Sequence, residues 1–407
     1  MLRLLTENTL DREEESMVKW IITNLEECTD VLGDGLHGTP KYTENGEYAF
    51  INGNNLVDGE ILIKKQTKRV DYSQYEKYKK PLTDRTILVS INGTLGNVGV
   101  YDSEKIILGK SACYFNVKES VDKDFIYYIV SSPKFRQYLE NNATGTTIKN
   151  ISLKQMREYT FSIPQIDEQK RISSVLRKID EKIRNNRAIN NNLEKQAKAI
   201  FLNEFLTLET LPNGWKQASL IDIADYLNGL AMQKYRPTAD ETGIPVLKIK
   251  ELRQGCCDDN SELCSPSIKS EYIIHDGDVI FSWSGSLLVD FWCGGICGLN
   301  QHLFKVTSNK YNKWFYYSWT KHHLDRFIVV AADKATTMGH IKRDELSKAE
   351  VLIPNEADYK RIGALLQPIY ELIIANRIEN KKLAETRDML LPKLMSGEID
   401  ISEVDCE

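Results

Sequence analysis

The sequence lacks the features that mark membrane proteins and most enzymes. No apolar run approaches the length of a membrane span, and the stretch from Met1 to Glu15 is charged rather than signal-like. There are only six histidines, and no H-E-x-x-H, G-x-S-x-G or Asn-Pro-Pro-aromatic motif is present. Gly109-Lys110-Ser111 lacks the leading glycine of a phosphate loop, because position 104 is Glu104. We therefore expect a cytoplasmic chain with no catalytic residue and no metal of its own.

Eight cysteines fit the cytoplasm as free thiols. Five of them fall in the second half, with His302 nearby: Cys256, Cys257, Cys264, Cys293 and Cys297. No C-x2-C pair is present, and the spacings fit no common set of zinc ligands. A zinc site remains the alternative to small, buried thiols.

The net charge of −5 is unfavourable for a protein that binds nucleic acid. Local basic patches, or basic partner subunits, can still supply the positive surface that such binding needs. The length of 407 residues allows two to four domains, and a hydrophobic content of 42% supports real cores.

The second half of the chain repeats the first at a shift of 190 positions. The matched pairs include Thr147 and Thr337, Ile151 and Ile341, Pro164 and Pro354, Arg171 and Arg361, Ile172 and Ile362, and Ile183 and Ile373. Solenoid and propeller repeats recur every 20 to 50 residues or so, which is far shorter. The period indicates one globular domain followed by one long helix, written twice.

We expect a mixed α/β fold with five segments. Short runs typical of strands, such as Tyr48–Ile51 and Thr86–Ile91, alternate with helical stretches in each globular part. The predicted segments are a first globular domain (1–164), a first long helix (165–207), a second globular domain (208–354), a second long helix (355–396) and a C-terminal tail (397–407).

The two long helices carry matching heptad patterns with polar positions near the middle. In an antiparallel pairing in which the numbers of two facing residues add up to 566, Asn186 faces Asn380 and Asn190 faces Asn376. Ile179 would face Arg387, which is the one poor match. A buried asparagine layer disfavours slipped registers, because a slip places amides against leucine. The alternative is that each helix packs on its own domain and the asparagines are solvated.

A helix of about 35 residues spans roughly 50 Å. Two such helices in antiparallel contact would act as a rigid spacer. Its length is on the order of one to one and a half turns of B-DNA.

Three motifs resemble those of a known family. They are the loop Leu211-Pro212-Asn213-Gly214-Trp215, the helix leader Ile163-Pro164-Gln165-Ile166-Asp167-Glu168-Gln169, and the ending Leu390-Leu391-Pro392-Lys393-Leu394. With the tandem layout, they make the chain similar to the specificity subunit of type I restriction–modification systems. The first domain keeps only Trp20 of the opening motif, and the second helix leader loses the usual Glu-Gln.

The resemblance implies a subunit that catalyses nothing itself. Each globular half would be a target-recognition domain for one half of a split sequence in double-stranded DNA. The helices would dock two modification subunits, which methylate adenine with S-adenosylmethionine. Restriction subunits, which use ATP and Mg, would join them. No cofactor is expected in this chain.

Candidate DNA-binding residues are polar or basic side chains on loops rich in glycine and threonine. In the first domain these are Asn92, Thr94, Asn97, Lys110, Thr146, Thr147, Lys149 and Asn150. In the second they are Ser282, Ser284, Asn300, Gln301, His302, Lys334, Thr336, Thr337, His340 and Lys342. The competing interpretation of the whole chain is a two-domain scaffold that joins other proteins and has no DNA preference.

Overall fold

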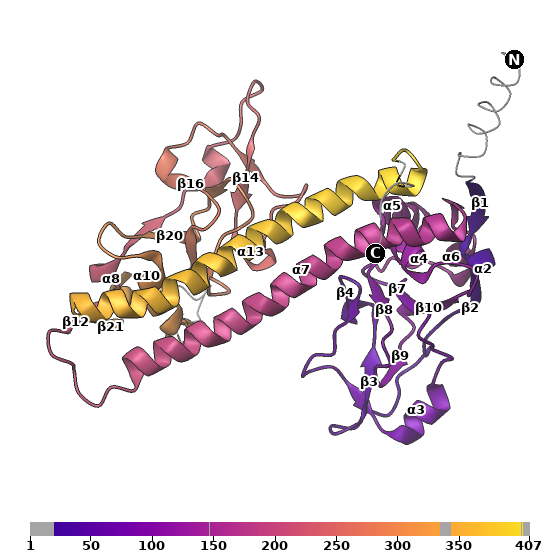
Figure 1. Ribbon diagram of the computed structural model, residues 1–407, viewed down its shortest axis with the longest axis horizontal. Coiled ribbons are helices and arrows are strands. Elements are labelled where there is room, and N and C mark those ends of the chain that lie inside the picture. The colour runs from indigo at the N-terminus through magenta and orange to yellow at the C-terminus, as the bar shows by residue number, and fades with distance from the viewer. Residues whose placement is uncertain (1–19, 146, 334–342, 400, 402–407) are drawn as a thin grey trace, which may run out of the picture. The chain divides into compact units, whose positions relative to one another are not determined.

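The chain forms two compact units, each with a mixed α/β fold. The computed structural model describes residues 20–145, 147–333, 343–399 and 401. The first unit contains residues 1–180 and 385–407, and the second contains residues 181–384. Each unit holds one globular segment and part of both long helices, α7 and α13 (Figure 1). The boundaries of these two units differ from those of the five segments expected from the sequence. The predicted mixed α/β class is confirmed.

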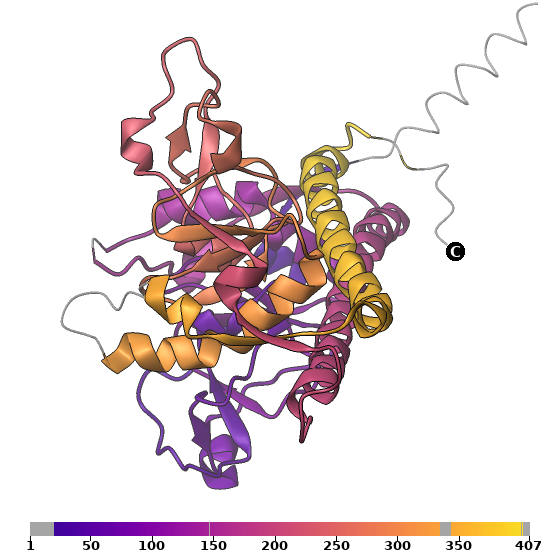
Figure 2. The same cartoon turned by 90° about the vertical axis from the view of Figure 1, so that its left-hand side faces the viewer.

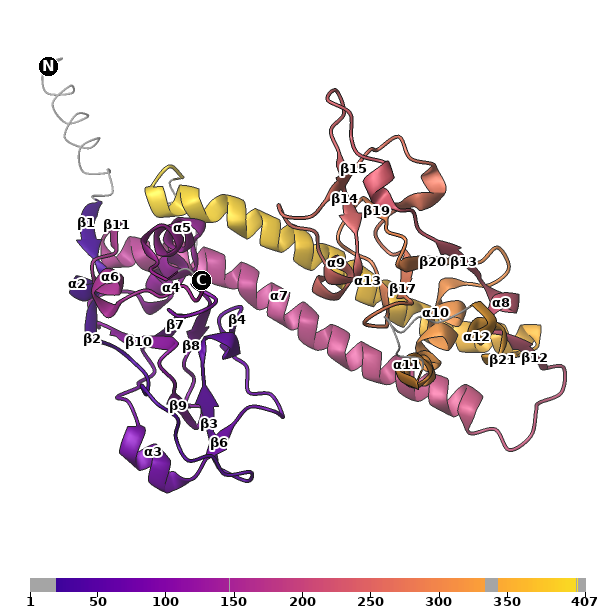
Figure 3. The same cartoon turned by 180° about the vertical axis from the view of Figure 1, so that it is seen from behind.

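The first unit is built on a four-stranded sheet with the strand order β2-β10-β7-β8. A second sheet has the order β6-β3-β9, with β3 and β9 parallel, and β1 pairs with β11 (Figure 3). The strands are β1 (Ile21–Asn24), β2 (Thr29–Asp34), β3 (Tyr48–Ile51), β4 (Leu56–Val57), β5 (Glu60–Ile61), β6 (Arg69–Val70), β7 (Thr86–Ser90), β8 (Val98–Val100), β9 (Ile106–Leu108), β10 (Ala112–Val117) and β11 (Thr160–Ile163). The helices are α2 (Leu25–Cys28), α3 (Tyr72–Tyr78), α4 (Lys123–Ser131), α5 (Pro133–Asn142), α6 (Leu153–Arg157) and α7 (Ile166–Phe201).

The second unit has a four-stranded sheet of order β13-β20-β17-β18 and another of order β15-β14-β19-β16. Its strands are β12 (Lys216–Ser219), β13 (Asp225–Asn228), β14 (Ile244–Leu247), β15 (Leu263–Cys264), β16 (Ile273–Ile274), β17 (Val279–Ser282), β18 (Leu288–Phe291), β19 (Cys297–Leu299), β20 (Leu303–Thr307) and β21 (Glu350–Ile353). Its helices are α8 (Leu220–Ile223), α9 (Ile249–Gln254), α10 (Lys313–His322), α11 (Leu324–Asp333), α12 (Arg343–Ser347) and α13 (Glu356–Ser396). Figure 2 shows the chain turned by 90° about the vertical axis from the view of Figure 1.

The two units repeat one plan. The sheet β2-β10-β7-β8 corresponds to β13-β20-β17-β18, and the parallel pair of β3 and β9 corresponds to that of β14 and β19. The pair of β1 and β11 corresponds to that of β12 and β21. The internal repeat in the sequence is therefore a repeat of fold.

Side-chain caps set the starts of two helices in the first unit. In the first unit Asp122 caps α4, because its carboxylate accepts a hydrogen bond from the Phe125 amide at 2.8 Å. Ser132 caps α5 in the same way, and Pro133 occupies the first helical turn. These caps fix where the amphipathic helices begin and so which faces they bury.

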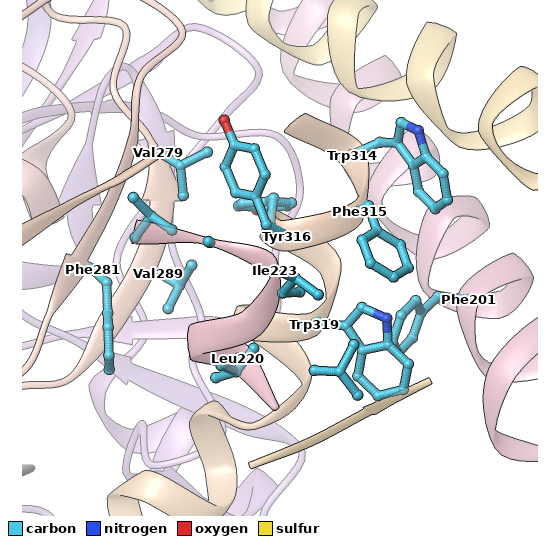
Figure 4. Close-up of a cluster of buried hydrophobic side chains, with 14 of the residues drawn as sticks. Phe201, Leu220, Ile223, Val279, Phe281, Val289, Trp314, Phe315, Tyr316 and Trp319 are labelled. Carbon is cyan, nitrogen blue, oxygen red and sulfur yellow. The ribbon is translucent and has the colours of Figure 1, made fainter. Parts of the chain in front are cut away.

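The core of the second unit is rich in aromatic side chains from α10. Trp314, Phe315 and Trp319 are each at most 2% exposed and pack beside Phe201 of α7 (Figure 4). Gly363 of α13 lets that helix approach closely, since a Cβ there would lie 3.0 Å from Nε1 of Trp314. The end of α7 and the first half of α13 are thereby held on this domain's core.

The core of the first unit draws on both ends of the described chain. Phe125 and Phe135 are fully buried, and they share one cluster with Leu391, Leu394 and Ile401. The residues after 385 thus complete a core whose sheet was formed more than two hundred positions earlier.

Within the second unit, α7 and α13 contact each other through a buried polar layer. Asn186 donates a hydrogen bond to Asn380 at 2.9 Å, and Asn376 donates one to Asn190 at 2.9 Å. Asn190 also donates to the carbonyl of Ile373 at 3.2 Å. Asn186, Asn190 and Asn376 are all less than 10% exposed, so these amides are not solvated.

Two arginines of α13 form ion pairs with α7, one in each unit. In the second unit Arg377 bonds Glu194 of α7 at 2.9 Å and Asp290 of β18 at 2.7 Å. In the first unit Arg387 bonds Asp180 of α7 at 2.8 Å. The hydroxyl of Tyr128, on α4, donates to the same carboxylate at 2.7 Å. Arg387 was the poor match in the sequence pairing, where it faced Ile179. In the structure it pairs with the next residue, Asp180.

Among the residues that the structure describes, no helix has the length and apolar character needed to cross a membrane.

Candidate nucleic-acid interface

In the first unit, three loops that carry predicted residues meet at one end of the four-stranded sheet. The amide of Gly93 donates to the carbonyl of Lys149 at 2.9 Å. Asn92 and Asn150 form a backbone bridge, and the Asn92 side chain donates to that of Asn150 at 3.0 Å. The amide of Ile91 donates to the carbonyl of Ser111 at 3.0 Å, which brings in the loop that contains Lys110.

The loop between β7 and β8 is held by Ser90, at the end of β7. Its hydroxyl donates to the carbonyl of Thr94 at 2.6 Å and accepts from the amide of Asn97 at 2.9 Å. Asn97 also donates from its side chain to the carbonyl of Gly53 at 3.4 Å. The turn therefore presents the exposed Thr94 on a rigid base, while Asn97 serves partly to hold that base.

Two further residues, Asn52 and Ser111, belong to this loop cluster and were missed in the sequence. The Ser111 hydroxyl donates to the side-chain carbonyl of Asn52 at 3.0 Å and accepts from the amide of Gly53 at 3.0 Å. A Cβ at Gly109 would lie 2.2 Å from the same Asn52 oxygen, so only glycine fits there. The sequence does hold a signal for Asn52: Phe50–Leu56 aligns loosely with Val246–Leu252 at a shift of 196, which sets Asn52 over Lys248.

The remaining predicted residues of the first unit lie on the surface. Lys110, Thr147 and Lys149 are exposed, and Asn150 is half-buried. Thr146 lies outside the described residues.

In the second unit, Ser282 ends β17, and Ser284 lies in the turn that follows it. The hydroxyl of Ser282 is fully buried and donates to the carbonyl of Ser286 at 2.9 Å. It therefore holds its turn as Ser90 does in the first unit. Ser284 is 2% exposed, and its hydroxyl lies 3.1 Å from Nδ1 of His302.

The segment Asn300-Gln301-His302 follows β19 and lies beside that turn. The amide of Asn300 donates to the carbonyl of Leu247 at 3.2 Å, and its side chain accepts from the amide of His302 at 3.2 Å. The amide of Gln301 donates to the carbonyl of Leu230 at 2.9 Å. Gln301 and His302 are half-buried and border a cavity of about 490 Å³. The other five predicted residues, Lys334, Thr336, Thr337, His340 and Lys342, lie outside the described residues.

The two loop clusters occupy equivalent places. A parallel bridge joins Leu36 to Gly109 in the first unit, and another joins Leu230 to Asn300 in the second. By this register Ser111 corresponds to His302, and Asn52 corresponds to Lys248. The scaffold is shared, and the side chains that it presents differ.

Charged side chains border the cavity of the second unit. Lys248 and Arg236 each form an ion pair with Glu262. The hydrogen bond from Lys248 is the main reason that the pKa of the Glu262 carboxyl lies below its ordinary value. The cavity therefore presents both a cation and a carboxylate that stays ionised at neutral pH.

Three of the five cysteines of the second half, Cys264, Cys293 and Cys297, are buried. Burial raises the pKa of Cys257, Cys264 and Cys293 to about 11, so their thiols stay protonated at neutral pH. Among the described residues, no group of three or more His, Cys, Asp and Glu side chains is placed to hold a metal ion.

The chain resembles known proteins along most of its length. A family model described as type I restriction modification DNA specificity domain matches it twice, at residues 17–195 and 212–385. The type I restriction enzyme MjaIX specificity subunit of Methanocaldococcus jannaschii is 25% identical over 90% of this chain and 87% of its own length. The HindI specificity subunit of Haemophilus influenzae is 19% identical over 68% of this chain and 77% of its own length.

A solved structure has a similar fold. The crystal structure of a type I restriction-modification S subunit from M. genitalium aligns with a TM-score of 0.56 and 18% identity. The alignment covers 93% of this chain and 96% of that one.

Proposed function

This chain belongs to the type I restriction modification DNA specificity family, and from that premise we propose that it is the DNA-recognition subunit of a restriction–modification complex. Each unit binds one half of a bipartite target in double-stranded DNA. The observation that carries the proposal is the repetition of one scaffold with different polar loops at the same edge. A shared scaffold with divergent loops is how one fold serves two different sequences.

The subunit does not catalyse. Its relatives are specificity subunits, and we propose that catalysis resides in two modification subunits and in restriction subunits that join them. S-adenosylmethionine, ATP and Mg belong to those partners. The outer faces of α7 and α13 are the proposed docking surface, because exposed apolar side chains such as Ile189, Leu365 and Leu372 lie there.

A competing function is a protein scaffold without DNA preference. A gel-shift and footprinting experiment on the chain, with and without its modification subunits, distinguishes this scaffold from DNA recognition. Recognition predicts a salt-dependent footprint in two separated blocks. Binding that shows no sequence preference with the partners present would favour the scaffold.

We further propose that the paired helices set the spacing between the half-sites. The asparagine pairs penalise a shifted register, and the arginine ion pairs tie α13 to α7 in each unit. Deleting four residues from one helix breaks the pairing, so we expect an altered spacer or lost activity with both half-site sequences kept.

A matched variant removes seven residues from each helix, 181–187 and 379–385, which keeps the heptad phase and retains Asn190 and Asn376. Seven residues correspond to about 10 Å of helix, or about three base pairs. A target library with varied spacers measures the preference. An unchanged spacer in the seven-residue variant would contradict the proposal.

A further inference from the structure

The second unit has a cavity where the first has a hydrogen bond. In the first unit Asn52 and Ser111 are joined at 3.0 Å. At the corresponding positions the second unit has Lys248 and His302, and both border the cavity of about 490 Å³. Resting on the proposed DNA-recognition function, we propose that this cavity reads one G·C base pair of the second half-site through Lys248 and Glu262.

The chemistry of the ion pair matches the edge of that base pair. In the major groove guanine presents two acceptors, N7 and O6, beside the N4 amino donor of cytosine. Lys248 donates and the carboxylate of Glu262 accepts, and the two lie side by side because they are hydrogen-bonded to each other. The ammonium has three donors and this bond uses one, so donors remain for guanine.

The carboxylate argues against a simple phosphate contact. A site for a phosphate gathers donors and cations, and an ionised Glu262 within it would repel the ligand. The cytosine amino group, by contrast, needs an acceptor. The hydrogen bond from Lys248 lowers the pKa of Glu262 further below neutral pH, so its carboxylate is ionised and able to accept.

The two reading groups are fixed to the sheet. Lys248 directly follows β14, and its amide donates to the carboxylate of Glu251 at 3.2 Å. The amide of Val246 donates to the carbonyl of Glu262 at 2.7 Å, which places Glu262 across from the same strand. Arg236 holds the Glu262 carboxylate from the other side. Side chains supported in this way can distinguish bases, because their positions are set before binding.

The pair is also open to a ligand. The side chain of Lys248 is 42% exposed and that of Glu262 is 22% exposed. His302 borders the same cavity, and its Nδ1 lies 3.1 Å from the hydroxyl of Ser284. A partly exposed ion pair contributes only modestly to stability, and its exchange for base contacts therefore costs the fold little.

The test uses the full chain reconstituted with its modification subunits and a duplex library in which each half-site is randomised. The variants are Lys248→Met, which keeps the length and removes the charge, and Glu262→Met, which removes the acceptor. The control, Lys310→Met, removes one exposed lysine of the same unit elsewhere. We expect both variants to lose about tenfold or more of the preference for G·C at one position of one half-site. The other half-site should keep its sequence, and the control should keep both.

Three outcomes overturn the proposal. A wild-type complex without any sequence preference removes the recognition function itself. A wild-type complex that selects a bipartite target while Lys248→Met weakens all sequences equally, with a salt slope reduced by about one, makes Lys248 a phosphate contact. A change of preference at an A·T pair would show that the ion pair reads the other base pair. Thermal melting checks that each variant is folded, and Glu262→Met tests the same pair independently of Lys248.

Discussion

The two units differ in their loops far more than in their sheets. Both units have the same strand order and the same parallel pairing in the second sheet. In both, a serine holds the turn of the main sheet: Ser90 after β7 and Ser282 after β17. The side chains at the end of the sheet where the loops meet, here called the loop edge, do not recur. Asn52 and Ser111 lie where the second unit has Lys248 and His302. The scaffold should therefore control stability, and the loop edge should control sequence preference. The following experiments test this division.

The largest effect is expected from truncation of the repeated core phenylalanines. Phe125 and Phe315 are both fully buried and lie 190 positions apart. Replacing either by Ala should cost about 3–5 kcal/mol, because the cavity cannot collapse in a packed core. Hydrogen exchange measured by mass spectrometry should show faster exchange in the unit that carries the change. Equal loosening of both units by one substitution would contradict their description as separate cores.

Acid should destabilise the second unit more than the first. Burial lowers the pKa of His323 to about 4, and its Nε2 lies 2.8 Å from the carbonyl oxygen of Glu350. The unfolded chain binds the proton near pH 6.5, so this histidine's stabilisation is complete above that pH and is lost as pH falls toward 4. The loss is on the order of 3 kcal/mol.

In the 190-residue repeat, Pro133 of the first unit aligns with His323, so the first unit has no imidazole at the equivalent position. Urea unfolding followed by tryptophan fluorescence measures the effect, since all tryptophans except Trp20 lie in the second unit. The variant His323→Gln should flatten the pH dependence between 6.5 and 4. An unchanged slope would assign the acid sensitivity to other groups, among them His322, whose pKa burial also lowers.

The asparagine layer should give an intermediate effect on stability. Asn376→Leu leaves the Asn190 amide oxygen without the 2.9 Å bond from Asn376 and should cost about 1–3 kcal/mol. Changing both Asn190 and Asn376 to Leu should recover most of that loss, because no polar partner is left alone. Denaturant melts of the two single variants and the double variant measure the coupling. Additive losses would mean that the two amides do not act as a pair.

The smallest change in stability is expected at the loop edge. Ser111→Ala removes the bonds to Asn52 and to the amide of Gly53 and should cost about 1 kcal/mol. Its effect on base preference should be confined to the half-site of the first unit. The matched change in the second unit is His302→Ala. If both variants altered the same half-site, the assignment of one half-site to each unit would be wrong.

The sequence predicted the regular parts of the fold well. Apolar runs such as Tyr48–Ile51 form β3 as expected, and the heptad pattern places Asn190 near Asn376. These signals are local or periodic, so they survive without knowledge of tertiary contacts.

The loop edge was less predictable. Asn52 and Ser111 lie 59 positions apart in the sequence, and the parallel pairing of β3 with β9 brings them together. Ser282 shows the opposite problem. Its loop position suggested a surface role, while the structure buries it beneath its own turn. Whether any of these side chains contacts DNA stays a prediction.

The first unit's core has a consequence for synthesis on the ribosome. Leu391, Leu394 and Ile401 complete that core, although its sheet lies within the first 120 residues. All of residues 181–384 must be translated in between, which takes roughly 10–40 s at about 5–20 residues per second. The later-encoded unit can therefore finish folding first. During that interval the nascent first unit exposes an apolar surface that needs protection from aggregation.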